Sequence, residues 1–143
     1  MKRWLALLWI LAFVACASQS PSFTGPTAPR PNGGGRAPAQ GAQQRGKASF
    51  YAKRFHGRKT ANGERFDMYA MTCAHRTLPF GTRVRVARVD DGRSVVVRVN
   101  DRGPYGKGRI VDLSYAGAQA LGMVREGVIS VVLTVIDCKG RRC

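Results

Sequence analysis

The first 63 residues of this chain contain no aspartate and no glutamate, although the whole chain has 143 residues. Any chemistry that uses carboxylates is therefore excluded from the N-terminal part. The eight carboxylates lie further along, at Glu64, Asp67, Asp90, Asp91, Asp101, Asp112, Glu126 and Asp137. Against 24 Lys and Arg they leave a net charge of +16, which favours polyanionic partners such as nucleic acid, anionic lipid headgroups or acidic cell-wall polymers.

The chain also has no apolar run long enough to cross a bilayer, which takes about 20 residues. A basic start, Met1-Lys2-Arg3, is followed by an apolar run over residues 4–14 and then by small residues. This pattern predicts a secretory signal peptide over residues 1–15. Residues 13–16 read Phe-Val-Ala-Cys and resemble a bacterial lipobox, so we expect Cys16 to become the first mature residue and to carry acyl chains.

A lipid anchor on Cys16 predicts a protein of the cell envelope that faces the periplasm, on the outer membrane if the organism has one. The alternative is ordinary cleavage nearby, which gives a soluble exported protein. Export by either route disfavours nucleic acid as the partner of the basic surface.

No spacing of cysteine and histidine resembles a zinc site, and the glycines of residues 103–108 lack the spacing of a phosphate-binding loop. We therefore expect no metal and no cofactor. Cys138 and Cys143 either close a small terminal loop as a disulfide or stay as thiols, and both outcomes are open in an exported protein. Cys73 lies in an apolar stretch and is expected to be a small core residue.

Residues 16–46 lack hydrophobic periodicity and predict a disordered tether that follows the lipidated N-terminus. The folded domain is expected over residues 47–137, followed by a basic tail over 138–143. Apolar alternation and turn signals predict a mainly β domain, a small barrel with one short helix over 115–121. Its strands are expected at residues 48–52, 71–74, 82–89, 93–99, 109–113 and 128–136.

Four of the carboxylates have structural explanations, since Asp90 and Asp91 belong to a turn and Glu126 and Asp137 to a loop and the tail. Four do not: Glu64, Asp67, Asp101 and Asp112. Asp112 interrupts the apolar Ile110-Val111-Asp112-Leu113, where a charge is unfavourable unless it is compensated.

His75 ends another strand, and strand ends that converge on one face of a barrel would gather these groups. Neighbouring carboxylates and partial burial raise the pKa of a carboxyl group, so one of them is expected to act as a general acid. The helix that begins after Asp112 has the opposite effect on that residue.

The stretch from Gly46 to Ile136 contains GKASFYAKRFHGRKTANGERFDMYAMTCAHRTLPFGTRVRV and RSVVVRVNDRGPYGKGRIVDLSYAGAQALGM, and it resembles the RlpA (rare lipoprotein A) family. The resemblance implies a six-stranded double-psi β-barrel and the activity of a lytic transglycosylase. Such an enzyme cleaves the bond between N-acetylmuramic acid and N-acetylglucosamine and leaves a 1,6-anhydro end. The family's substrates are peptidoglycan strands without stem peptides, at the division septum and beside septal proteins.

The resemblance places family functional positions on Glu64, Asp67, His75 and Asp101. Asp112 resembles the catalytic aspartate of related double-psi barrels, so we expect Asp112 to be the acid and base, with Asp101 as the alternative. The substrate-binding side chains are expected to be Tyr51, Phe55, Arg58, Arg102, Tyr105 and Arg109. The alternative function is a non-catalytic glycan-binding or septal scaffold lipoprotein on the same fold.

Overall fold

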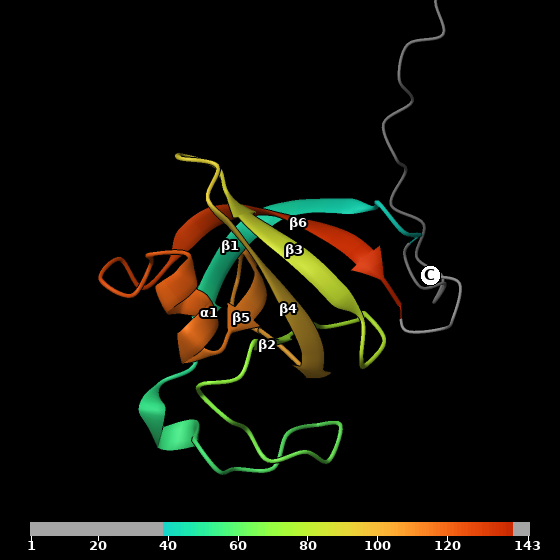
Figure 1. Cartoon of the computed structure of the whole chain (residues 1–143), viewed down its shortest axis with the longest axis vertical. Coiled ribbons are helices and arrows are strands. Elements are labelled where there is room, and N and C mark those ends of the chain that lie inside the picture. The colour runs from blue at the N-terminus through green and yellow to red at the C-terminus, as the bar shows by residue number, and fades with distance from the viewer. Residues whose placement is uncertain (1–38, 139–143) are drawn as a thin grey trace, which may run out of the picture. The chain divides into compact units, whose positions relative to one another are not determined.

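A computed structural model describes residues 39–138, and these form a closed barrel with the strand order β1-β5-β2-β4-β3-β6 (Figure 1). All six expected strands and the expected helix are present, so the predicted mainly β barrel is confirmed. The strands are β1 (Gln43–Phe50), β2 (Thr72–Ala74), β3 (Arg83–Arg88), β4 (Ser94–Asp101), β5 (Arg109–Leu113) and β6 (Ile129–Asp137). The helical segments are the short 3-10 helix η1 (Lys53–Phe55) and α1 (Tyr115–Ala120).

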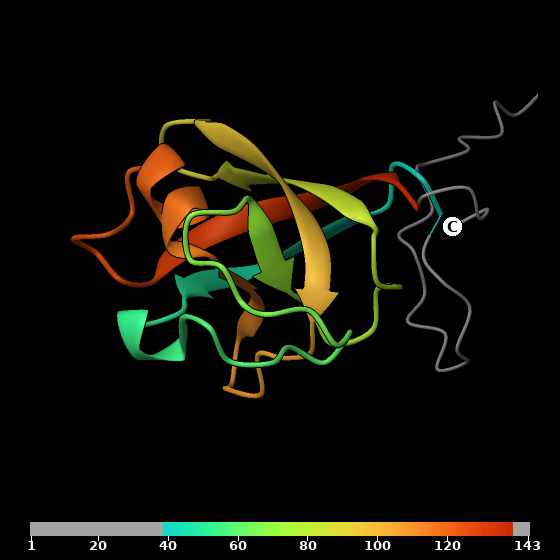
Figure 2. The same cartoon turned by 60° about the horizontal axis from the view of Figure 1, so that its bottom comes forward.

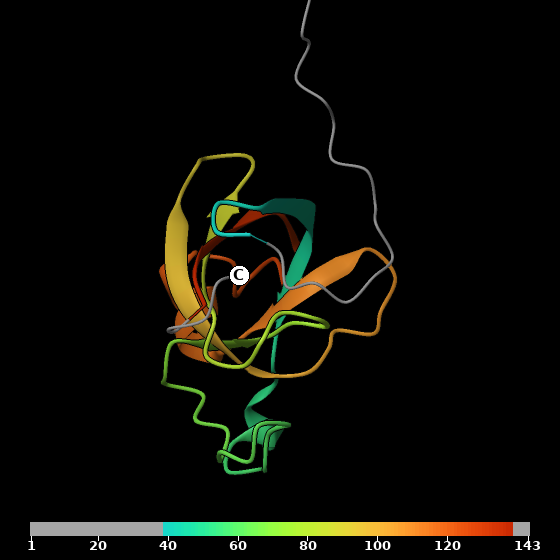
Figure 3. The ribbon, with the colours of Figure 1, turned by 90° about the vertical axis from the view of Figure 1, so that its right-hand side faces the viewer.

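Exposed polar residues and buried apolar residues alternate along the strands, and the apolar ones form the core. In β3 the exposed Arg83 and Arg85 alternate with Val84 and Val86, which are fully buried. The other strands contribute valines and leucines to the same interior, each of which stabilises the fold by about 1.5–3 kcal/mol. The segment that contains η1, drawn in green, lies outside this barrel at one end of it in both Figure 1 and Figure 3.

The first strand begins earlier than the sequence predicts. Gln43 to Gly46, assigned above to the tether, form the first half of β1 because their backbones pair with residues 131–134 of β6. Their polar side chains gave no hydrophobic signal for this pairing. At Gly46 a side chain would not fit, since a Cβ there would lie 2.6 Å from Ile110 Cγ2.

The signal peptide, Cys16, most of the tether and the tail beyond residue 138 lie outside the described residues. Within residues 39–138 no helix has the length and apolar character needed to cross a membrane. Cys73 is a free thiol in the core, as expected, and burial raises its pKa. Cys138 is disulfide-bonded, and the predicted pairing with Cys143 lies outside the described part of the chain.

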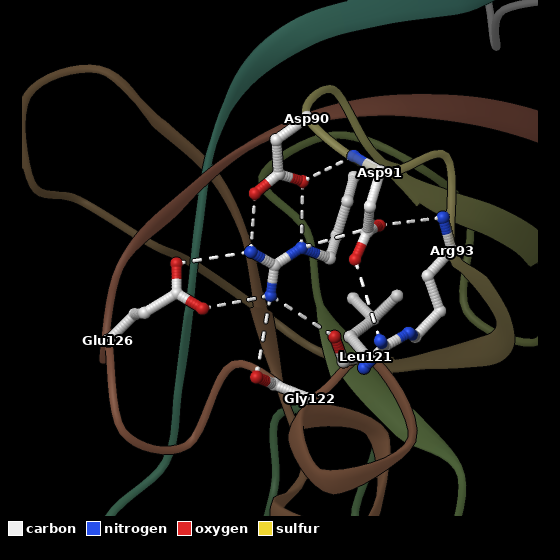
Figure 4. Close-up of polar contacts among 7 residues, drawn as sticks. Asp90, Asp91, Arg93, Leu121, Gly122 and Glu126 are labelled. Carbon is white, nitrogen blue, oxygen red and sulfur yellow. Dashed lines mark hydrogen bonds and ion pairs between the residues drawn. The ribbon is translucent and has the colours of Figure 1, made fainter.

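A buried arginine ties the β3–β4 hairpin to the segment after α1. The Arg88 guanidinium donates to Asp90 Oδ1 at 2.8 Å and to the two carboxylate oxygens of Glu126 at 3.0 and 3.1 Å (Figure 4). It also donates to the backbone carbonyls of Leu121 and Gly122 at 3.3 and 3.4 Å. The hydrogen bonds to Asp90 and Glu126 raise the pKa of Arg88. The hydrogen bond from Arg88 lowers the pKa of Asp90. Arg88 therefore fixes three chain segments at once.

We expect Arg88→Met to lower the melting temperature by about 5 °C or more, because it removes the donor shared by two carboxylates and two carbonyls. The matched control is Arg85→Met, which makes the same exchange on an exposed position of the same strand. Thermal unfolding followed by circular dichroism measures both variants. Equal melting temperatures for the two would show that the Arg88 contacts do not stabilise the fold.

Candidate functional site

Four residues on neighbouring strands form one row across the barrel. Ser49 of β1 pairs with Asp112 of β5, Asp112 pairs with Ala74 of β2, and Ala74 pairs with Asp101 of β4. Figure 2 shows β2 (green arrow) beside β4 (gold arrow). Since adjacent strands lie about 4.8 Å apart, the backbones of the two aspartates are separated by roughly 10 Å. Residues far apart in the sequence are thus brought onto one face.

A β-bulge places Asp101 in this row. The register of β2 against β4 runs from Cys73–Val99 directly to Ala74–Asp101, so Asn100 is left without a partner on β2. A bulge re-aims the side chains that follow it and is frequent beside functional sites. The single-residue shift brings Asp101 level with Asp112 across β2.

The Asp101 carboxylate is held by three donors. Its Oδ1 accepts hydrogen bonds from the backbone N–H groups of Ala61 and Arg102, each at 2.8 Å, and its Oδ2 accepts one from the Tyr51 hydroxyl at 2.8 Å. Both oxygens are therefore engaged within the protein. A carboxylate held by three donors is better suited to orienting other groups than to donating a proton.

Tyr51 contacts Asp101 and lies near enough to Asp112 for the charge of that carboxylate to act on it. Burial, the hydrogen bond to Asp101 and the charges of Asp101 and Asp112 raise the pKa of Tyr51 above its usual range. Its ring packs edge-on against Phe55, with 5.6 Å between centroids, and is tilted against Phe66 at 4.9 Å. The phenol is thus a fixed proton donor at neutral pH.

The Asp112 carboxylate has one engaged oxygen and one open oxygen. Its Oδ1 accepts a hydrogen bond from the Ser49 hydroxyl and a longer one from Arg109 Nη1 at 3.4 Å. Arg109 Nη1 also donates to Ser49 Oγ at 2.7 Å. Within residues 39–138, Asp112 Oδ2 has no hydrogen-bond partner, and the side chain is 14% exposed. Asp112 is therefore largely shielded from water, and one of its two oxygens accepts no hydrogen bond from the described residues.

Glu64 supports the site from the loop that contacts Asp101. Its two oxygens accept hydrogen bonds from the Arg98 guanidinium, both at 2.9 Å, and one also contacts the Asn100 amide at 3.3 Å. The bond to Arg98 lowers the pKa of Glu64 to about 2. Glu64 is thus an ionised clamp that holds residues 60–64 against β4, and it makes no contact with Asp112.

His75 is buried, and the hydrogen bonds of its ring go to residues other than the aspartates. Nδ1 accepts hydrogen bonds from the backbone N–H groups of Thr77 and Leu78 at 3.2 and 3.1 Å, and Nε2 lies 3.2 Å from Gln44 Oε1. Burial, with the nearby Arg102 and Arg76, lowers the pKa of His75 to about 4. The imidazole is therefore neutral at physiological pH. It contacts the row of aspartates through its backbone N–H, which donates to the Asp101 carbonyl at 3.2 Å.

Asp67 is not part of the row. It is half exposed, its Oδ1 accepts a hydrogen bond from the Tyr69 backbone N–H at 2.9 Å, and it lies 3.9 Å from His56 Nδ1. These contacts stay within the loop that contains η1. The structure therefore brings Asp101 and Asp112 together, places Glu64 and His75 beside Asp101, and leaves Asp67 at a distance from Asp112.

The expected substrate-binding side chains differ in the contacts that they make within the protein. Phe55 packs beside Tyr51 and lies under the guanidinium groups of Arg54 and Arg58, at 5.1 and 5.4 Å from its ring centroid. Arg102 donates to the carbonyls of His75 and Leu78 and lies 3.8 Å from the Phe80 ring centroid. Tyr105 is 81% exposed. Phe55 is thus joined to the site through Tyr51, whereas the Arg102 guanidinium is engaged by backbone carbonyls and by Phe80.

Sequence reasoning missed four residues that shape the site: Ser49, Gln44, Arg98 and Asn100. Each acts through a contact to a residue distant in the sequence, which no local pattern encodes. Residues 39–138 hold no group of three or more His, Cys, Asp and Glu side chains that could bind a metal ion.

Comparison with known proteins matches residues 43–133 to the family model described as lytic transglycolase. An endolytic peptidoglycan transglycosylase RlpA of Vibrio cholerae is 55% identical over 97 residues, which are 68% of this chain and 37% of that protein. One of Neisseria meningitidis is 55% identical over 93 residues, 65% of this chain and 39% of that protein. The chain thus spans about two fifths of the length of these relatives.

Two solved structures share the fold. The Streptomyces papain inhibitor superposes with a TM-score of 0.58 at 24% identity, over 71% of this chain and all of that protein. An expansin of Clavibacter michiganensis, solved with cellohexaose, gives a TM-score of 0.54 at 20% identity, over 67% of this chain and 51% of that protein. At these identities the likeness concerns the barrel alone.

Proposed function

This chain belongs to the RlpA family of double-psi β-barrel lytic transglycolases, and from that membership we propose that its barrel cleaves peptidoglycan glycan strands as a lytic transglycosylase. The observation that carries the proposal is the row of Asp112 and Asp101 on strands either side of β2, with the open Oδ2 of Asp112. A lytic transglycosylase needs one acid that first gives and then takes a proton. The site offers one such group.

In the proposed reaction, protonated Asp112 donates its proton to the oxygen that links N-acetylmuramic acid to N-acetylglucosamine, and the bond from C1 to that oxygen breaks. The 6-hydroxyl oxygen of the same muramic acid then attacks C1 and closes the 1,6-anhydro ring. Asp112 takes up the hydroxyl proton and regains its starting state. No water is consumed, so a second carboxylate to activate water is not required.

The neighbours of Asp112 have separate roles in this proposal. Ser49 and Arg109 fix the carboxyl group through Oδ1, which leaves Oδ2 directed at the substrate. Asp101 and Tyr51 form a second fixed pair that orients the sugar by hydrogen bonds. Phe55 and Tyr105 offer aromatic faces for the sugar rings on either side.

The test is incubation of the purified chain with peptide-free glycan strands, followed by mass spectrometry of the products. We expect fragments that end in 1,6-anhydromuramic acid and internal cuts along the strand. Strands that bind to the protein but stay intact would support the scaffold function instead.

We also propose that Cys16 carries the lipid that holds this protein in the envelope, on the outer membrane where one exists and facing the periplasm. The support is the Phe-Val-Ala-Cys sequence after an apolar run. Septal partners stay a prediction from the family resemblance.

For the anchor we expect Cys16→Ser to move the protein from the detergent phase to the aqueous phase in detergent phase separation, because the variant has no sulfur to acylate. Cys73→Ser, which changes a cysteine of the barrel core, is the matched control and should leave folded protein in the detergent phase. The anchor proposal fails if Cys16→Ser partitions as the unchanged protein does.

A further inference from the structure

A compact turn, from Thr60 to Glu64, supplies one of the donors that hold Asp101. The Ala61 backbone N–H donates to Asp101 Oδ1 at 2.8 Å. The ends of the turn are joined, because the Thr60 N–H donates to the Glu64 carbonyl at 2.8 Å. Asn62 Oδ1 accepts hydrogen bonds from the Thr60 hydroxyl at 2.6 Å and from the Glu64 N–H at 3.1 Å. The turn is therefore one hydrogen-bonded unit, and the place of its N–H donor depends on how the unit is attached to the barrel.

Three residues of β4 attach this turn to the barrel. Arg98 Nη1 and Nη2 donate to the two carboxylate oxygens of Glu64, both at 2.9 Å. The carbonyl of the buried Asn100 accepts the Asn62 N–H at 3.2 Å, and its side-chain amide donates to Glu64 Oε2 at 3.3 Å. Asp101 makes the third contact, through its Oδ1. The turn thus lies along the bulged end of β4.

The pair of Glu64 and Arg98 is the one charged attachment among these contacts. The two side chains are 44% and 38% exposed, and a single ion pair at such exposure contributes little. Here two parallel N–H···O bonds add a fixed geometry to the attraction of the charges. The pKa of Glu64 is lowered to about 2 by this contact, so at neutral pH the carboxyl group has no proton to donate. Glu64 can therefore serve the site through its position.

The backbone of Arg98 is fixed on both sides. β4 lies between β2 and β3, and Arg98 is paired with Thr72 on one side and with Arg83 on the other. Its backbone N–H donates to the Met71 carbonyl at 3.0 Å. The guanidinium group thus extends from a strand and not from a loop, and strands hold the side chains of a site more precisely than loops do.

We propose that Arg98 is a positioning residue, which acts on Asp101 through Glu64. Arg98 holds the turn against β4, and the turn then presents the Ala61 N–H to Asp101 Oδ1. With Oδ1 occupied in this way, Oδ2 is the oxygen that receives the Tyr51 hydroxyl. The inference rests on the proposed function, and it gives Glu64 a role in the site without proton transfer.

In this proposal the site needs opposite charges at positions 64 and 98, whichever residue carries which charge. Glu64→Arg or Arg98→Glu alone places two like charges in contact and should release the turn. The double variant has an ion pair of reversed polarity, and the Asn100 amide can turn over to offer its oxygen to the new guanidinium. If Glu64 instead transferred a proton, the double variant would be as inactive as Glu64→Arg.

The first measurement is kcat/KM for the formation of 1,6-anhydro ends on peptide-free glycan strands by the full chain. We expect each single variant to lose about tenfold or more, and the double variant to return to within about threefold of the unchanged protein. The matched control is Arg85→Glu, which makes the same charge reversal on an exposed position of β3 and should lose less than about threefold. A double variant as inactive as Glu64→Arg overturns the proposal.

The second measurement follows the contact itself by NMR. It records the chemical shift and the hydrogen-exchange rate of the Ala61 N–H, with the Val99 N–H as the reference, because the latter donates to the Thr82 carbonyl at 2.9 Å within the barrel. In each single variant the Ala61 N–H should exchange about tenfold faster while the Val99 N–H does not change. A general loss of stability would accelerate both. The double variant should restore the Ala61 signal, and an unaltered Ala61 N–H in Arg98→Glu overturns the proposal.

Arg98→Lys serves if a reversed charge unfolds the chain. It keeps the positive charge but offers one ammonium group in place of two parallel N–H donors. We expect the Ala61 N–H to exchange about threefold faster or more in this variant, with the Val99 N–H unchanged. Equal exchange rates in Arg98→Lys and the unchanged protein overturn the proposal.

Failure of the proposed function gives a different result, namely no 1,6-anhydro ends from the unchanged protein. The NMR comparison needs no substrate, so it still tests the role of Arg98. Faster exchange of the Ala61 N–H in the single variants, with recovery in the double variant, upholds that role. The same exchange rate in all variants overturns it.

Discussion

Asp112→Asn is expected to lower the rate at which 1,6-anhydro ends form by a factor of about 10³, within the range of about 10² to 10⁴ for the loss of a general acid. The amide cannot supply the proton that the leaving oxygen needs. Its Oδ1 can still accept hydrogen bonds from Ser49 and Arg109, so the position of the side chain and the fold should be kept. The measurement is mass spectrometry of strands digested for increasing times, beside a strand-binding assay in which the variant should bind normally.

Asp101→Asn is the control that separates the two aspartates. Asn Oδ1 would still accept the backbone N–H groups of Ala61 and Arg102, so the bulge is preserved while the charge is lost. We expect a loss of about tenfold, because the amide NH₂ of Asn takes the place of Oδ2 and cannot accept the hydrogen bond that the Tyr51 hydroxyl donates to Asp101. The assignment of the acid would pass to Asp101 if this variant were inactive and Asp112→Asn retained activity.

The barrel was predictable because its pattern is local. Arg83 to Arg88 alternate charged and apolar residues, Asp90-Asp91-Gly92 favours a tight turn, and the strand after it repeats the alternation. Pairing of these strands buries one face of each. The first half of β1 was not predicted, because backbone hydrogen bonds join it to β6. Such bonds do not depend on hydrophobic side chains, so the sequence pattern does not indicate them.

The site was predictable only in part. Asp112 was conspicuous as a charge within an apolar strand, and its environment agrees with that signal, since the side chain is 14% exposed and hydrogen-bonded. The roles of Glu64 and His75 depend on partners distant in the sequence. Glu64 pairs with Arg98, and the His75 ring faces Gln44. Such pairings follow from the register of the closed barrel, which the strand pattern alone does not fix.

The neutral state of His75 predicts a loss of stability in mild acid. Its pKa is lowered to about 4 in the folded chain, against a reference value near 6.5 for the unfolded chain. Between these values the unfolded chain binds a proton that the folded chain does not, so stability falls as pH decreases from 6.5 and levels off below about 4. From pH 7 to pH 5 we expect the free energy of unfolding to fall by about 2 kcal/mol, measured by urea denaturation.

His75→Asn should remove most of this fall, because Asn Oδ1 can accept the backbone N–H groups of Thr77 and Leu78 and does not titrate. The comparison is made between pH 7 and pH 5 so that Glu64 does not contribute to it. The pKa of Glu64 is lowered to about 2, and the stability that this carboxylate contributes is lost only as pH falls below about 4.5. His56→Asn changes the only other histidine of the chain and is the matched control. If His56→Asn removed the fall and His75→Asn did not, the buried imidazole would not be its source. That result would mean that the folded protein binds a proton at His75 as readily as the unfolded chain does. A protonated Nδ1 could not accept the backbone N–H groups of Thr77 and Leu78.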